Sequence, residues 1–206
     1  MEYYRRHLPH IHPEQATFFI TFRLHNSLPN WIIRKLQEDR EVDKAMLLSG
    51  VLDRGEFHRR YFEQFDSFLD AQKEGNRWLI DPATASIVAN ACTYCDGKSF
   101  DLISYCVMPN HVHLLIQITD EHKRSEKILY THLTSVMQSL KSYTAKECNK
   151  LLGRNGQFWQ RESYDRMIRD QCELDQTIQY IVNNPVAAGF VKKWQDWKFT
   201  YCAFDL

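Results

Sequence analysis

The hydrophobic pattern changes its period several times along the chain, and each change marks an expected element. Residues 17–24, 100–107 and 111–118 are rich in β-branched and aromatic side chains, which predicts three strands. Only three residues separate the last two strands, so we expect them to form a hairpin. Residues 158–168 alternate weakly between apolar and polar side chains and predict a fourth strand.

Apolar residues spaced three and four apart predict helices after the first strand. A helical pattern begins near Pro29 and continues through residues 41–79. Asp81 and Pro82 are typical of an N-cap and a first helical turn, so we expect another helix from there to about Cys92.

Two further helices are expected at about residues 125–149 and 171–183, and the sequence Asn183-Asn184-Pro185 predicts the end of the second. The element order is then strand, helix, strand, strand, helix, strand, helix. This order resembles the ferredoxin-like fold of the α+β class, in which helices pack on one face of an antiparallel sheet.

The 206 residues suit one domain, over residues 1–206, with a helical insertion at 37–79 in the first crossover. The tail at 186–206 is aromatic enough to pack on that domain. No apolar run reaches 18 residues and the N-terminus has no apolar leader, so we expect no membrane segment, no signal peptide and a cytoplasmic location. Without a second cysteine pair to complete a zinc site with Cys92 and Cys95, all six cysteines are expected to be free thiols.

Charge is balanced overall but uneven along the chain. Lysine plus arginine equals aspartate plus glutamate at 26 each, which argues against binding nucleic acid through bulk positive charge alone. Residues 37–81 hold seven basic and eleven acidic residues, whereas residues 141–169 hold seven basic and three acidic ones. Aromatic residues interleave with the basic ones in the second segment, a pattern that suits single-stranded nucleic acid as well as an ordinary solvated helix.

The segment His111-Val112-His113 is the clearest candidate for chemistry. Because side chains alternate along a strand, both imidazoles point to one side while Val112 points to the other, into the core. Two imidazoles on one side of a strand, two residues apart, are close enough to bind one metal ion. Two exposed strand histidines with no metal would show the same sequence pattern.

Tyr180 and Asn184 lie four residues apart on the last expected helix and therefore share one face. A tyrosine hydroxyl and an amide oxygen are available there. With the two imidazoles, the amide oxygen would leave positions open on an octahedral ion. The alternatives are a core tyrosine and a helix-capping asparagine.

Three separated motifs give a specific resemblance. The runs YCVMPNHVHLLI, FWQRESYDRMIRD and YIVNNPVAAGFV, within residues 105–191, resemble the REP-associated tyrosine transposases. That group belongs to the His-hydrophobic-His single-tyrosine transposases and nucleases, which include the transposases like that of insertion sequence 200.

The resemblance implies a ferredoxin-like fold, a metal-dependent endonuclease and strand transferase, and a 5′-phosphotyrosine intermediate. It implies Tyr180 as the nucleophile, His111 and His113 as ligands of Mg²⁺ or Mn²⁺, and Asn184 as a third metal ligand. Tyr164, on the expected fourth strand, is the competing nucleophile.

The expected partner is single-stranded DNA with hairpins, bound by a monomer or homodimer that associates with the nucleoid when on DNA. Candidate DNA-binding residues are basic or aromatic: Arg5, Arg6, Lys141, Lys146, Lys150, Arg154, Trp159, Arg161 and Arg166. For Trp159 a place in the core is the alternative.

Two other functions remain open from the sequence. One is a catalytically inactive, domesticated protein that binds DNA hairpins. The other is a ferredoxin-like RNA-binding domain, which would carry aromatic residues on the open face of two adjacent strands.

Overall fold

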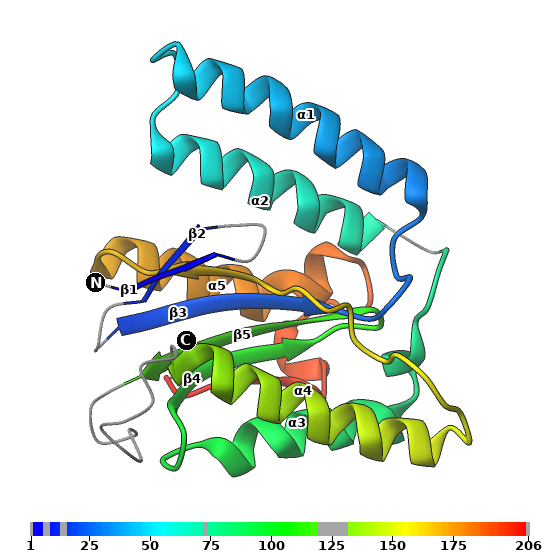
Figure 1. Ribbon diagram of the computed structural model, residues 1–206. Coiled ribbons are helices and arrows are strands. Elements are labelled where there is room, and N and C mark those ends of the chain that lie inside the picture. Colours follow the sequence, from blue (N-terminus) through cyan, green and yellow to red (C-terminus); the bar gives the residue numbers. More distant parts are fainter. Residues whose placement is uncertain (1, 6–8, 13–15, 72–73, 119–131, 205–206) are drawn as a thin grey trace. The chain divides into compact units, whose positions relative to one another are not determined.

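The computed structural model describes residues 2–5, 9–12, 16–71, 74–118 and 132–204 (Figure 1). The chain divides into two compact units. The first, the sheet unit, combines residues 1–25 with 78–206, and the second, the helical unit, is formed by residues 26–77. None of the described helices is long and apolar enough to cross a membrane.

The sheet unit contains a five-stranded antiparallel sheet, in the order β6-β3-β5-β4-β7. Its strands are β3 (Ala16–Arg23), β4 (Asp101–Val107), β5 (His111–Ile118), β6 (Tyr164–Met167) and β7 (Thr200–Cys202). Strands β3 to β6 lie side by side in the spatial order of the ferredoxin-like fold. Strand β7, from the C-terminal tail, pairs with β4 and extends the sheet at that edge. The predicted α+β sheet is thus confirmed.

One face of the sheet packs against α3 (Pro82–Cys95) and α4 (His132–Leu151), as Figure 1 shows. Asp81 caps α3 as expected, because its side chain accepts a hydrogen bond from the Ala83 N–H. Val112 lies in the core on this side. The predicted start of α4 near residue 125 lies outside the described residues.

The opposite face of the sheet is occupied by α5 (Gln171–Ala187), so helices cover both faces rather than the one face expected from the sequence. The prediction that Pro185 ends this helix is wrong, because α5 continues through it to Ala187. Proline fixes φ near the helical value and removes one N–H donor, so a helix can continue past it at the loss of one hydrogen bond. The helix ends instead before Gly189, whose φ of +75° is outside the helical range.

Two other segments differ from the sequence prediction. The expected strand at 158–168 is reduced to β6, and Trp159 makes only an isolated bridge with Leu24. The N-terminal residues form a two-stranded sheet that the sequence pattern did not indicate, from β1 (Glu2–Arg5) and β2 (Pro9–His12).

The helical unit is a helix pair, α1 (Asn30–Leu48) and α2 (Arg54–Ala71). Leu28, Ile32, Leu36 and Leu69 form its apolar core. Two short 3₁₀ turns, η1 (Trp78–Ile80) and η3 (Trp194–Asp196), belong to the sheet unit.

Candidate active site

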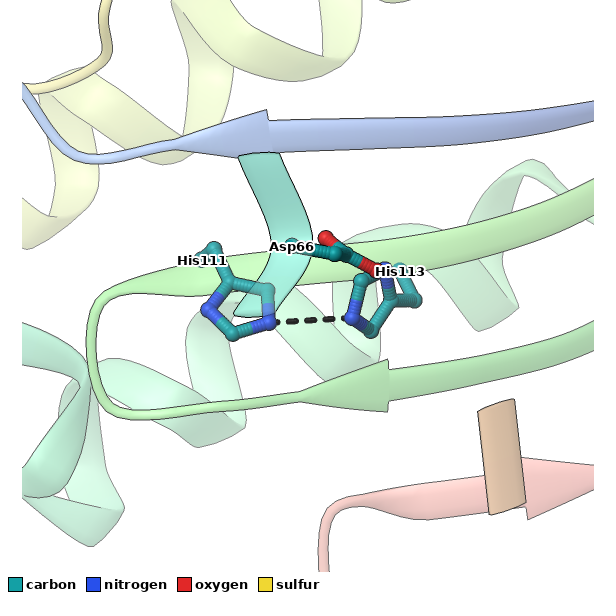
Figure 2. Close-up of side chains that lie close together, drawn as sticks. All are labelled: Asp66, His111 and His113. Carbon is teal, nitrogen blue, oxygen red and sulfur yellow. Dashed lines mark hydrogen bonds between the residues drawn. The ribbon is translucent and has the colours of Figure 1, made fainter. Parts of the chain in front are cut away.

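His111 and His113 begin β5, on the face of the sheet opposite α3 and α4. Strand alternation places Val112 in the core and both imidazoles on the α5 side. Their Nε2 atoms lie 2.9 Å apart (Figure 2). Both side chains are buried. Asp66, also labelled in that figure, is part of the helical unit.

Hydrogen bonds to neighbouring side chains orient the two imidazole rings. His111 Nδ1 lies 2.7 Å from Asn110 Oδ1, and since an amide oxygen only accepts, this nitrogen donates its hydrogen. His111 Nε2 therefore carries a lone pair. His113 Nδ1 lies 2.9 Å from the Thr21 hydroxyl, which accepts or donates according to the tautomer.

The distance between the two Nε2 atoms fits a shared metal ion. Two imidazole nitrogens at about 2.1 Å from one ion, at a right angle, lie about 3.0 Å apart. When Thr21 donates to His113 Nδ1, His113 Nε2 donates a hydrogen bond to His111 Nε2; when Thr21 accepts, both Nε2 atoms carry lone pairs that one cation can share. Outer hydrogen bonds of this kind are usual around metal-binding histidines.

Burial keeps both imidazoles neutral. It lowers the pKa of His111 to about 3, and burial together with the neighbouring His111 lowers the pKa of His113 well below its usual value. Neutral imidazoles are the form that binds metal, so neither ring needs to lose a proton at neutral pH before coordination.

We predict that the metal-free protein loses stability on mild acidification. In the unfolded state both histidines have pKa values of about 6.5, and in the folded state their pKa values are far lower. As the pH falls below the unfolded pKa, the unfolded state therefore binds more protons than the folded state. The free energy of unfolding then falls with decreasing pH, by up to about 1.4 kcal/mol per pH unit for each histidine. Urea titrations between pH 7 and 5 measure the slope, which should flatten when both residues become glutamine.

Tyr180 lies on α5, with its ring beside His113. The ring centroids are 5.4 Å apart with the planes at 70°, and the Tyr180 ring also meets Phe19 of β3 edge to face, at 6.1 Å. Tyr180 is 36% exposed. The structure thus brings Tyr180 and the histidine pair together, with the tyrosine accessible from solvent.

Asn184 follows Tyr180 by one helical turn and is buried inside α5. The alternative reading of this residue as a helix cap is wrong, because α5 continues past it to Ala187. The competing nucleophile Tyr164 is buried in β6 at 6% exposure. Of the two candidate tyrosines, Tyr180 is therefore the exposed one.

The candidate DNA-binding residues have different surroundings. Lys146, Lys150 and Arg161 are exposed. Lys141 Nζ donates to the carbonyls of Gln160 and Arg161, at 2.8 and 3.1 Å, and to Ser163 Oγ at 3.0 Å. The guanidinium of Arg154 lies 3.6 Å from the ring centroid of Trp78.

Two candidates bond to other parts of the fold through their side chains. Trp159 is 5% exposed and its indole N–H donates to Thr144 Oγ1 at 2.9 Å, so it occupies the core position that the sequence left open. Arg166 bonds to side chains of α5. Arg5 belongs to β1, and Arg6 lies outside the described residues.

Sequence reasoning missed the residues that support the site. Phe19 and Thr21 of β3 contact Tyr180 and His113, and Asn110 orients His111. Thr21 is the register partner of His113 across β3 and β5. Strand pairing in the correct register identifies Thr21, but a strand pattern alone does not fix that register.

Three comparisons show which known proteins this chain is similar to. The model of a family described as transposase IS200 like matches residues 72–184. A Haemophilus influenzae protein whose name places it among the REP-associated tyrosine transposases is 29% identical over 107 residues, which cover 52% of this chain and 61% of that protein. The chain therefore spans less than two thirds of that relative's length.

A solved structure of a REP-associated tyrosine transposase, bound to a REP hairpin, has the same fold. It superposes with a TM-score of 0.53 over 97% of this chain and 82% of that one, at 18% sequence identity.

Proposed function

The chain belongs to the family of IS200-like transposases, and we propose that it cleaves and rejoins single-stranded DNA beside hairpins with Tyr180 as its nucleophile. The resemblance of its three motifs to the REP-associated tyrosine transposases supports this proposal, as do the matches reported above. The proposed intermediate is a 5′-phosphotyrosine.

The observation that carries the proposal is the position of Tyr180 beside the histidine pair. An accessible tyrosine meets His113, whose Nε2 lies 2.9 Å from that of His111. A nucleophile adjacent to ligands for a divalent cation is the arrangement that phosphodiester cleavage by a tyrosine needs.

In the proposed reaction, the Tyr180 oxygen attacks the phosphorus of the scissile phosphodiester. A bond forms from phosphorus to the tyrosine oxygen, and the bond to the 3′ oxygen breaks. The tyrosine proton is lost and the departing 3′ oxygen gains one, so the DNA leaves with a 3′-hydroxyl. When bound to His111 and His113, Mg²⁺ or Mn²⁺ supplies charge stabilisation for the phosphate. Attack by another 3′-hydroxyl reverses the step and joins strands without ATP.

For Asn184 we propose a third ligand role, through its side-chain oxygen. Its place one turn after Tyr180 on α5 supports this role. Nitrogen and oxygen donors together suit Mn²⁺ and Mg²⁺ better than a thiolate-rich site would.

The exposed cations on and near α4 are the proposed contacts for the DNA backbone. Lys146 and Lys150 lie one turn apart on α4, and the exposed Tyr143 lies on the preceding turn. Lys141 links α4 to residues 160–163, which brings Arg161 to the same side of the sheet unit. Phosphate-binding cations beside an exposed ring suit single-stranded DNA.

The alternative of an RNA-binding domain has less support. Such a domain needs aromatic residues on an open sheet face. The aromatic residue Phe19 on the site face is fully buried, and α5 occupies that face.

A covalent-trapping assay tests the proposal. Labelled hairpin DNA with a single-stranded flank is incubated with the protein and Mn²⁺, and the mixture is run on a denaturing gel. We expect a shifted protein–DNA band that needs the metal and is lost with chelator. Hairpin binding in a mobility-shift assay without any covalent band would contradict the proposal and identify the inactive hairpin-binding alternative.

A further inference from the structure

A side-chain link joins β6 to α5 on the site face of the sheet. The Arg166 guanidinium bonds to the Glu173 carboxylate through Nη1, and its Nη2 donates to Thr177 Oγ1 at 3.2 Å. Glu173 and Thr177 lie one turn apart on α5, so one planar guanidinium spans the first two turns of the helix.

The groups that Arg166 meets are themselves held in place. The second carboxylate oxygen of Glu173 accepts the Arg169 N–H at 2.8 Å, and the Thr177 hydroxyl donates to the Glu173 carbonyl at 2.7 Å. Asp170 caps the helix by accepting the Glu173 N–H at 2.9 Å. Both partners of the ion pair are largely shielded, with side-chain exposures of 29% and 23%.

The same guanidinium also contacts the aromatic residue that supports Tyr180. The Arg166 guanidinium lies over the Phe19 ring at 5.4 Å from its centroid. The Phe19 ring meets Tyr180, which in turn meets His113. Two chains of contacts therefore connect Arg166 to Tyr180, one through α5 and one through the Phe19 ring.

We propose that Arg166 and Glu173 are positioning residues that fix α5 on the sheet and so hold Tyr180 against the histidine pair. The catalytic part of this inference rests on the proposed role of Tyr180 as nucleophile. The link replaces the DNA contact expected for Arg166, since its guanidinium is engaged with Glu173, Thr177 and Phe19.

The first test observes Tyr180 without any reaction. The full chain is labelled with 3-fluorotyrosine at its ten tyrosines, and the Tyr180 fluorine signal is assigned by its loss in Tyr180→Phe. We expect Arg166→Met to shift or broaden this signal and Glu173→Gln to act in the same direction. The exposed matched controls Arg161→Met and Asp175→Asn should leave it unchanged. An unchanged Tyr180 signal in Arg166→Met, with the protein folded, would overturn the proposal.

The second test separates positioning from DNA binding. We expect Arg166→Met to slow formation of the covalent adduct by about tenfold or more, while its affinity for hairpin DNA changes less than about twofold. Combining it with Glu173→Gln should add little, because the two residues act as a unit. Weaker hairpin binding with a reduced salt dependence would instead show a phosphate contact and overturn the proposal.

These readouts distinguish the two proposals. A wild-type protein that forms no adduct contradicts the nucleophile role of Tyr180, and the fluorine signal still decides whether Arg166 positions that residue.

Discussion

Replacing Tyr180 by phenylalanine is expected to abolish the covalent protein–DNA adduct, with a loss of at least about 10³-fold in its rate of formation. Only the hydroxyl is removed, so the ring keeps its contacts with His113 and Phe19. Because the residue is partly exposed, the free energy of unfolding should change by less than about 0.5 kcal/mol. Hairpin affinity should also stay near that of the wild type.

Tyr164→Phe is the matched control for this result. Tyr164 is the other candidate nucleophile, and it is buried in β6, so its substitution should leave adduct formation intact. An adduct that survives in Tyr180→Phe and disappears in Tyr164→Phe would assign the nucleophile to the strand.

Replacing either histidine of the pair by alanine is expected to remove the metal dependence together with the activity. One imidazole cannot hold the ion in the geometry that two nitrogens 2.9 Å apart provide, so adduct formation should fall at least about 100-fold. In the wild type, Mn²⁺ at 100 times its dissociation constant should raise the free energy of unfolding by about 2.7 kcal/mol. Thermal unfolding with and without Mn²⁺ measures this difference, which His111→Ala and His113→Ala should lose.

His25→Ala provides the control for the histidine variants. This partly buried histidine lies 3.4 Å from the Gln160 side chain and is outside the pair. It should keep the stabilisation by Mn²⁺ and the metal-dependent adduct. Stabilisation by Mn²⁺ that persists equally in His111→Ala and His113→Ala would place the ion elsewhere.

The sequence was sufficient to predict the site strand and the helix that carries Tyr180, but not the face of the sheet that this helix covers. Alternation in β5 places Val112 in the core and both histidines on the opposite face, which depends only on local geometry. Whether α5 covers that same face is a tertiary question. It depends on long-range contacts such as that of Phe19 with Tyr180, which no local pattern encodes.

The misplaced end of α5 has a local explanation. The sequence Asn183-Asn184-Pro185 is typical of a helix end, because proline disfavours the helical conformation in the residue before it. In the structure, Ile181 and Val182 are fully buried, and this packing supports the helix across the proline. Tertiary burial therefore outweighs the local signal, and Asn184 moves from a predicted end to a buried interior position.

Arg166 shows that the charge of a segment does not predict which of its cations are exposed. The basic segment at 141–169, with its interleaved aromatic residues, predicted DNA contacts for six of its seven cations, Arg166 among them. In the structure, Lys146 and Lys150 are exposed, whereas Arg166 bonds within the fold to Glu173 and Thr177. Charge in the sequence does not distinguish a surface cation from one that joins two elements.

The most direct test of the proposed function is to identify the residue that carries the DNA. The wild-type adduct, formed with hairpin DNA and Mn²⁺, is digested with nuclease and protease, and the modified peptide is sequenced by mass spectrometry. We predict a nucleotide phosphate on Tyr180, joined through its 5′ phosphate, with a free 3′-hydroxyl on the released strand. A phosphate on Tyr164 or on any other residue, or a released strand that ends in a 3′ phosphate, would contradict the proposed mechanism.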